Sequence, residues 1–416
     1  MKVHFPEQAR PDWRRTAAWV AGLVLLAWLA CFRFPVVWVA TGIGEPNRPF
    51  MDLYGLLAAS DAAQAGVNPF LPHNFDPYHR PHVYTTWWLE LGRLGLGRAD
   101  TYWLGWVLLG TVLLTAIVMV RPATRKEGLG LMLLLISPAF LMTVNRANND
   151  LVVFVLISGG LLCFRQGSWL VRSVGVLLFA LSAVLKYYPL VTLIVLLELR
   201  SRREFAGNLA LYGLLLVVAW PGLEPGLKSA AQHMPQPDWL YAYGAPVLMR
   251  NLGAAGALGW LVPAGFLAGW AAVGAWRKPA ALVPAVPAAE REFMLGAAML
   301  VGLFFLGSSF VYKLVFVVWL LPWLWHPHAD AVEARWCRVT WRLLLAVVWF
   351  EGLLAVGLNL LAGPGAEDEA LILLKAGLVV SQLLTWAWVA CLARFLLAML
   401  WRSLRAGWMA VRPRVV

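Results

Sequence analysis

The chain has 416 residues, of which 61% are hydrophobic and 13% are charged. Soluble domains carry about a quarter charged residues, so this composition excludes an ordinary soluble protein and indicates a polytopic membrane protein. The net charge of +12 comes mostly from short basic clusters beside apolar runs, a pattern typical of helices oriented in a membrane and not of nucleic-acid binding.

Apolar runs along the chain predict an all-α bundle of about 12 membrane segments, within a range of about 10 to 13. Because cytosolic loops carry excess Lys and Arg, we expect residues 1–15 and the basic tail 394–416 in the cytosol. The whole chain is expected to form one domain. The predicted segments are residues 19–40, 102–120, 129–144, 151–164, 173–199 as two short segments, 205–220, 258–276, 293–306, 314–325, 343–361 and 371–393.

Residues 173–199 have basic clusters at both flanks, and one crossing would leave one cluster outside. Two short segments broken at KYYP, residues 186–189, keep both clusters inside. Each half has about eleven residues and covers only about 16 Å of a hydrocarbon core about 30 Å thick. We therefore expect Lys186 at the apex of a broken pair, where it lines a cavity below the outer surface.

The longest polar interruption is a predicted outer loop, residues 41–101, which is rich in Pro, Gly and aromatic residues. We predict a folded cap on the periplasmic face of the inner (cytoplasmic) membrane, with an interfacial helix over residues 53–65 that ends at Gly66. A second outer loop is predicted over residues 221–251.

Polar side chains gather on this predicted outer face, and at membrane depth such residues are costly and often functional. A sugar transfer from phosphate needs a base near the acceptor hydroxyl and fixed positive charge near the leaving phosphate. Asp52 suits the first role. Arg80, Lys186 and Lys313 suit the second without a metal. The residues expected there are Asp52, Arg80, His82, Asn148, Asn149, Asp150, Lys186, His233, Asp238, Tyr312 and Lys313.

Each of these residues also has a structural interpretation. Asp52 could cap the following helix, and Lys186 or Lys313 could snorkel to an interface. Arg80 could pair with Asp76 only to hold the loop, and residues 148–150 could cap the next helix. The cysteines and the loop histidines have no diagnostic metal spacing, so no metal is expected. The histidines are His73, His79 and His82.

Three short elements resemble glycosyltransferase family 87, which belongs to the GT-C superfamily of polyprenyl-phosphate-sugar-dependent transferases and includes mycobacterial mannosyltransferases of the phosphatidylinositol mannoside pathway. The first is FMDLY followed by AGVNPF and RPHVY, which resembles the family's opening Asp and its G-x-[ND]-P-[YF] turn. The second is ALSAVLKYYPL, similar to a helix ending in K-x-x-P, and the third is GSSFVYKLVFVVWLLP, similar to a late Tyr-Arg/Lys element. The resemblance covers roughly residues 15–330.

The resemblance implies a GT-C type bundle in which Asp52 is the catalytic base of an inverting transfer. It implies that Lys186 and Lys313 hold the donor phosphate. We assign Arg80 to the same role because of its charge and its place in the predicted outer loop. NRANND, residues 145–150, departs from the Gly-Gln-x-Asn run of many relatives, and Leu53 replaces the second acid of other GT-C families, which argues against a metal. The residues assigned to substrate binding are Tyr54, His82, Asn148, Asn149, Asp150, Tyr187 and Tyr312.

The expected function is transfer of a hexose such as mannose from a polyprenyl-phosphate donor to a lipid-linked or cell-envelope glycan acceptor. The expected partners are this donor, the acceptor and membrane lipids, without nucleic acid and without a cofactor. A transporter or flippase of a lipid-linked anionic substrate is the alternative, although no repeated halves are visible. A structural subunit of an envelope assembly is a third possibility, which would leave Asp52 and Lys186 without a role.

Overall fold

The computed structural model describes residues 13–43, 49–166, 168–199, 201–237, 240–251, 261, 264–265, 267–270, 287–326, 328, 330–361 and 367–411. The predicted span 258–276 lies largely outside these residues, as do Asp238 and the ends of the chain. A two-stranded antiparallel ribbon joins β1 (Ala242–Tyr243) to β2 (Ser309–Phe310). The α-helices are α1 (Trp13–Arg33), α2 (Val36–Ala40), α3 (Met51–Gln64), α4 (Glu90–Arg93), α5 (Thr101–Val120), α6 (Arg125–Leu135), α7 (Pro138–Arg146), α8 (Asp150–Phe164), α9 (Trp169–Leu185), α10 (Arg202–His233), α11 (Ala245–Asn251), α13 (Pro287–Leu306), α14 (Leu321–Leu324), α15 (Ala331–Leu361) and α16 (Glu367–Val411), and the 3-10 helices are η1 (Thr86–Leu89), η2 (Arg98–Asp100), η3 (Tyr188–Glu198) and η4 (Val311–Leu320).

Within the described residues, five helices are long and apolar enough to cross a membrane, and a sixth span results if α6 and α7 count as one. The chain is therefore a helical protein with several potential membrane spans, but the described part of the chain does not confirm the predicted total of about twelve. The shorter apolar helices explain most of the difference. A helix such as α8, with 15 residues, covers about 22 Å and does not cross a core about 30 Å thick.

Several predicted segments are broken where the sequence carries proline. The predicted span 129–144 consists of α6 and α7, which meet at an angle of 56°. Ser137 begins α7 because its hydroxyl accepts a hydrogen bond from the amide of Phe140, and Pro138 occupies the first turn. The predicted span 19–40 is likewise divided, since α1 ends at Arg33 and α2 begins after Pro35.

The predicted break at KYYP is confirmed. α9 ends at Leu185, and Lys186 has extended backbone (φ −155°, ψ 128°) before the chain continues as η3. An extended residue interrupts the helical hydrogen bonds, and Pro189 cannot restore them because it has no amide hydrogen. The side chain of Lys186 is buried, at 6% exposure, so the snorkelling interpretation of this lysine is wrong.

The predicted outer loop 221–251 is wrong at its start, because α10 continues through Pro221 and Pro225 to His233. Packing against the polar loop stabilises this end of α10. The hydroxyl of Ser229 donates to the carbonyl of His82 at 2.6 Å. A Cβ added at Gly226 would lie 2.1 Å from the carbonyl oxygen of Tyr84, so glycine is required for this approach.

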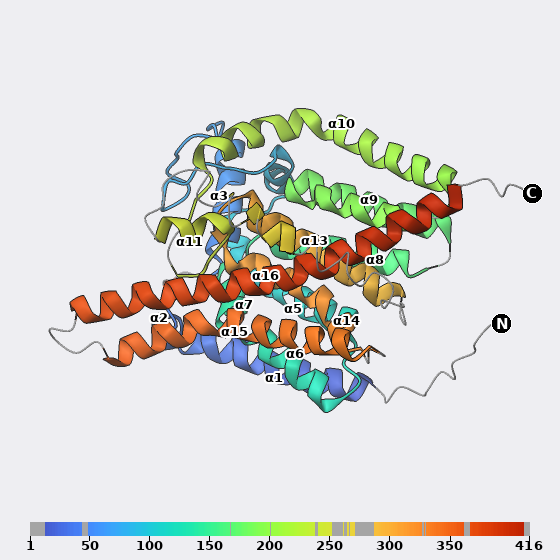
Figure 1. The fold of residues 1–416 in the computed structure, drawn as a ribbon. Coiled ribbons are helices and arrows are strands. Elements are labelled where there is room, and N and C mark those ends of the chain that lie inside the picture. Colours follow the sequence, from blue (N-terminus) through green and yellow to red (C-terminus); the bar gives the residue numbers. More distant parts are fainter. Residues whose placement is uncertain are drawn as a thin grey trace, which may run out of the picture.

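The helices form one elongated bundle (Figure 1). The start of α1 and the end of α16 lie at one end, and α3 lies at the other. We call residues 49–100 the cap, and the end of the bundle where they lie the cap end. A helix predicted over residues 53–65 is present as α3, which runs from Met51 to Gln64. Large buried aromatic side chains fill the interior between the two ends, among them Trp28, Trp319 and Phe316.

Candidate functional site

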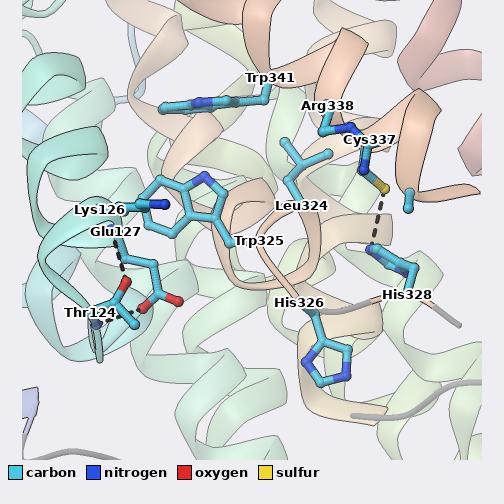
Figure 2. A pocket seen from close by; sticks show the side chains of 11 residues that line it. Thr124, Lys126, Glu127, Leu324, Trp325, His326, His328, Cys337, Arg338 and Trp341 are labelled. Carbon is cyan, nitrogen blue, oxygen red and sulfur yellow. Dashed lines mark hydrogen bonds between the residues drawn. The ribbon is translucent and has the colours of Figure 1, made fainter. Parts of the chain in front are cut away.

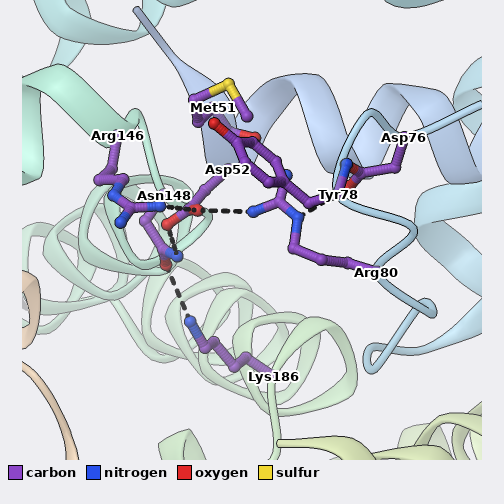
Figure 3. Close-up of polar contacts among 8 residues, drawn as sticks. All are labelled: Met51, Asp52, Asp76, Tyr78, Arg80, Arg146, Asn148 and Lys186. Atoms are coloured by element: carbon purple, nitrogen blue, oxygen red, sulfur yellow. Dashed lines mark hydrogen bonds and ion pairs between the residues drawn. The ribbon is translucent and has the colours of Figure 1, made fainter. Parts of the chain in front are cut away.

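Asp52 lies in the first turn of α3 and points into a cluster of nitrogen donors (Figure 3). Its Oδ2 accepts a hydrogen bond from Nδ2 of Asn148 at 2.8 Å. Its Oδ1 lies 3.4 Å from Nη1 of Arg80 and 3.3 Å from Nη1 of Arg146. The N-cap of α3 is Phe50, and no side chain caps it, so the interpretation of Asp52 as a helix cap is wrong.

The start of α3 is fixed by its neighbours, which sets the position of Asp52. The backbone amide of Phe50 donates to the carbonyl of Asn145 at 2.6 Å, and this joins the cap to α7. Phe50 has a left-handed backbone (φ 63°) and a fully buried ring. A Cβ at Gly105 would lie 2.3 Å from that ring, so the absence of a side chain on α5 makes room for it.

Arg80 is held by three acceptors. Its Nε donates to Oδ2 of Asp76 at 2.8 Å, its Nη2 donates to the carbonyl of Met51 at 2.9 Å, and its Nη1 faces Asp52. Asp76 is almost completely buried, at 1% exposure, whereas the side chain of Arg80 is 34% exposed. Arg80 therefore contacts both carboxylates at once, and its ion pair with Asp76 fixes the guanidinium at the edge of the site.

Arg146 was missed in the sequence assignment, although it lies in the polar NRANND run on the predicted outer face. It is the last residue of α7, and its guanidinium lies 5.7 Å from the ring centroid of Phe310. Its side chain is 28% exposed, and Asp52 is its one acidic partner among the described residues. A guanidinium has five N–H donors, so most of those of Arg146 face no carboxylate.

Lys186 lies behind Asp52 in a buried polar group. Its Nζ lies 2.8 Å from Oδ1 of Asp150 and donates to Oδ1 of Asn148 at 3.0 Å and to Oδ1 of Asn149 at 2.6 Å. Asn148 in turn donates to Asp52, as Figure 3 shows. Asp150 also accepts a hydrogen bond from the hydroxyl of Tyr188. Lys186 therefore neutralises Asp150 and orients the amide that holds Asp52.

Aromatic rings line the space around the two lysines. The Nζ of Lys186 lies 5.3 Å from the centroid of Tyr84 and 5.9 Å from that of Tyr312. The Nζ of Lys313 lies 5.3 Å from the centroid of Tyr188. In the cap, burial and the nearby charge of Asp52 raise the pKa of Tyr84 above its ordinary value, so its hydroxyl remains protonated at neutral pH.

Four residues predicted near the site point elsewhere. The side chain of Tyr54 forms a hydrogen bond with Arg98 and therefore lies on another face of α3 than Asp52. His82 is buried, with Nε2 3.1 Å from the carbonyl of Thr85, and burial lowers its pKa to about 4. Tyr187 packs against the buried side chains of Ala219 and Leu223 on α10. His233 is on α10 itself, with Nδ1 3.2 Å from the carbonyl oxygen of Ser229.

Among the residues that the structure describes, no group of three or more His, Cys, Asp or Glu side chains is arranged to hold a metal ion. Of the cap histidines, His73 has buried ring nitrogens without a hydrogen-bond partner, and Nδ1 of His79 lies 3.3 Å from the carbonyl of His73. Both are engaged in packing the loop. The charged groups next to Asp52 are guanidiniums, which suit an anionic ligand.

Comparison of the sequence with protein-family models, with curated proteins and with solved structures finds no match.

Proposed function

We propose that this protein is a membrane glycosyltransferase of GT-C type, which transfers a hexose such as mannose from a polyprenyl-phosphate donor to a lipid-linked or cell-envelope glycan acceptor. The observation that carries the proposal is the position of Asp52 between Arg80 and Arg146 at one end of an apolar helical bundle. The resemblance of the three sequence elements to glycosyltransferase family 87 supports the class of donor. The positive-inside pattern supports an outward-facing site in the cytoplasmic membrane.

In this proposal Asp52 is the general base. Its carboxylate takes the proton from the acceptor hydroxyl, and the hydroxyl oxygen attacks the anomeric carbon of the donor. The bond between that carbon and the phosphate oxygen breaks, and the electron pair leaves with polyprenyl phosphate. Attack from the face opposite the leaving group inverts the anomeric configuration.

The leaving phosphate gains negative charge, and Arg146 is the best placed group to stabilise it. Arg146 is partly exposed and has N–H donors that face no carboxylate among the described residues. Arg80 is fixed by Asp76 and offers its remaining donors from the other side of Asp52. Fixed guanidiniums stabilise a developing phosphate charge without reorganisation at the moment of reaction.

Lys186 and Lys313, expected from the sequence to hold phosphate, receive different roles in the proposal. Lys186 is engaged with Asp150 and two asparagines, so it positions Asn148, which orients Asp52. Lys313 adds positive charge behind Tyr188. The lipid tail of the donor enters laterally between helices, as the apolar exposed surface of the bundle permits.

The experiment is a transfer assay with purified protein, radiolabelled polyprenyl-phosphate mannose and a lipid extract of the host. We expect the wild type to label a lipid or glycan product, and Asp52→Asn to lose at least a hundredfold in rate, because removal of a general base costs about 10²- to 10⁴-fold. Asp61→Asn is the matched control, since Asp61 is also on α3 but pairs with Arg98 at 2.6 Å. Equal transfer by wild type and Asp52→Asn would refute the role of Asp52, and no transfer with any polyprenyl-linked sugar would favour the flippase.

A further inference from the structure

A cavity of about 530 Å³ lies at the opposite end of the bundle from the cap. It is formed by the start of α6, the turn that follows α14 and the first turns of α15 (Figure 2). Its volume is in the range of ordinary small-ligand sites, which is about 300–1,000 Å³. None of its residues takes part in the proposed sugar transfer.

The charged wall of this cavity is basic. Lys126 projects from α6 and Arg338 from α15, and both are exposed. Among the described residues, neither forms an ion pair with a carboxylate. Glu127 also lines the cavity, but its carboxylate accepts the backbone amides of Ala123 at 2.6 Å and Thr124 at 3.3 Å as part of the N-terminal cap of α6. The cavity therefore presents two available cations to a ligand.

Two tryptophans form most of the apolar wall, which Leu324 completes. The rings of Trp325 and Trp341 meet edge to face, with centroids 5.3 Å apart. Gly130 on α6 makes room for them, because a Cβ there would lie 2.8 Å from Trp325 and 3.2 Å from Trp341. Tryptophan is enriched where membrane helices meet the lipid head groups, since its ring is apolar and its N–H is polar.

The cavity also lies between helices that belong to candidate membrane spans. α15 is one of them, and α6 belongs to the bent pair that makes another. Lys126 is in the first turn of α6, and Arg338 is in the third turn of α15, so both are near the helix ends, where lipid phosphates are found. A ligand that combines a phosphate with an apolar body can therefore reach both walls from the side of the bilayer.

We propose that this cavity binds an anionic phospholipid, with its phosphate between Lys126 and Arg338 and its glycerol and first acyl carbons against Trp325 and Trp341. Lys and Arg pair strongly with a phosphate, and each contributes to the attraction of anionic lipid near the surface. A zwitterionic phospholipid brings its own ammonium group to the two cations and so binds less well. The inference does not depend on the glycosyltransferase proposal.

The test is native mass spectrometry of the full chain in detergent, titrated with phosphatidylglycerol, phosphatidylcholine or inorganic phosphate. We expect phosphatidylglycerol to remain bound to the wild type and Lys126→Gln/Arg338→Gln to bind it at least tenfold more weakly, since each cation is worth about a factor of five. The matched control is Arg202→Gln/Arg203→Gln, which removes two exposed charges from the start of α10 at the same end of the bundle.

Four outcomes decide the matter. Retained binding by the control, with weak displacement by inorganic phosphate, supports the lipid site. Equal losses in both double variants would show general surface electrostatics and overturn it. Equal binding of phosphatidylcholine, or full displacement by millimolar inorganic phosphate, would also overturn it. Both variants alter exposed side chains, and their helical circular dichroism is checked against the wild type before titration.

Discussion

Protonation of His82 is expected to loosen the cap at acidic pH. His82 is 4% exposed, its ring packs between Phe70 and Tyr84, and its carbonyl accepts the hydroxyl of Ser229 on α10. Burial lowers its pKa from 6.5 to about 4, with a further lowering by the nearby His73 and an opposing effect of the Thr85 carbonyl. Because the unfolded cap binds the proton more readily, the stability due to neutral His82 is complete above pH 6.5 and falls as the pH drops towards about 4.

The size of the effect follows from the two pKa values. Relative to neutral pH, protonation of His82 lowers the free energy of unfolding of the cap by about 2 kcal/mol at pH 5 and by about 3 kcal/mol at very low pH, because each pKa unit corresponds to 1.36 kcal/mol. Hydrogen exchange of residues 67–88, measured from pH 7.5 to 4.5 and corrected for the intrinsic exchange rate, reports this opening. His82→Gln should remove most of the pH dependence, whereas His233→Gln, which changes the exposed end of α10, should keep it. Protection that is constant across this pH range in the wild type would refute the reasoning.

Two further substitutions test the packing behind the site. Gly226→Ala should destabilise the protein by about 1–3 kcal/mol, because the new Cβ meets the carbonyl oxygen of Tyr84 at 2.1 Å. Gly213→Ala has open space around the new Cβ and should be neutral or stabilising by up to about 1 kcal/mol. Thermal unfolding in detergent compares the two variants, and equal melting temperatures would contradict the contact between α10 and the cap. Lys186→Met should cost about 3–5 kcal/mol, since it leaves Asp150 buried without its partner, and Asp150→Asn should recover much of this loss in the double variant. A single variant as stable as the wild type in the same assay would show that the pair is not structural.

Much of the local structure was readable from the sequence because it depends on short-range rules. The helix α3, the break at Lys186 and the gathering of basic residues around Asp52 follow from polar interruptions, proline and charge sign. Asp52, Asn148 and Lys186 are far apart in the chain, and the structure brings them together. That Tyr54 points away from Asp52 was also predictable, because the two-residue step from Asp52 to Tyr54 along a helix corresponds to a rotation of about 200°.

Other features depend on tertiary packing and could not be read from the sequence. The count of about twelve spans is not confirmed by the described residues, because charge parity treats every apolar run as a crossing, whereas α8 and α9 are shorter than the candidate spans. The continuation of α10 through Pro221 depends on its contacts with the cap. Arg146 lies within the recognised polar run, but only the bend between α6 and α7 directs it towards Asp52.

Donor binding by variants of the guanidinium pair tests the central claim most directly. Equilibrium binding of radiolabelled polyprenyl-phosphate mannose is measured for the wild type, Arg146→Gln and Asp52→Asn in detergent. Loss of a charge-assisted hydrogen bond costs about 1.5–3 kcal/mol, so we expect Arg146→Gln to weaken binding by about 10- to 100-fold. Asp52→Asn should bind the donor at least as well as the wild type and fail only in transfer. Unchanged donor affinity in Arg146→Gln would contradict a phosphate site at this cluster.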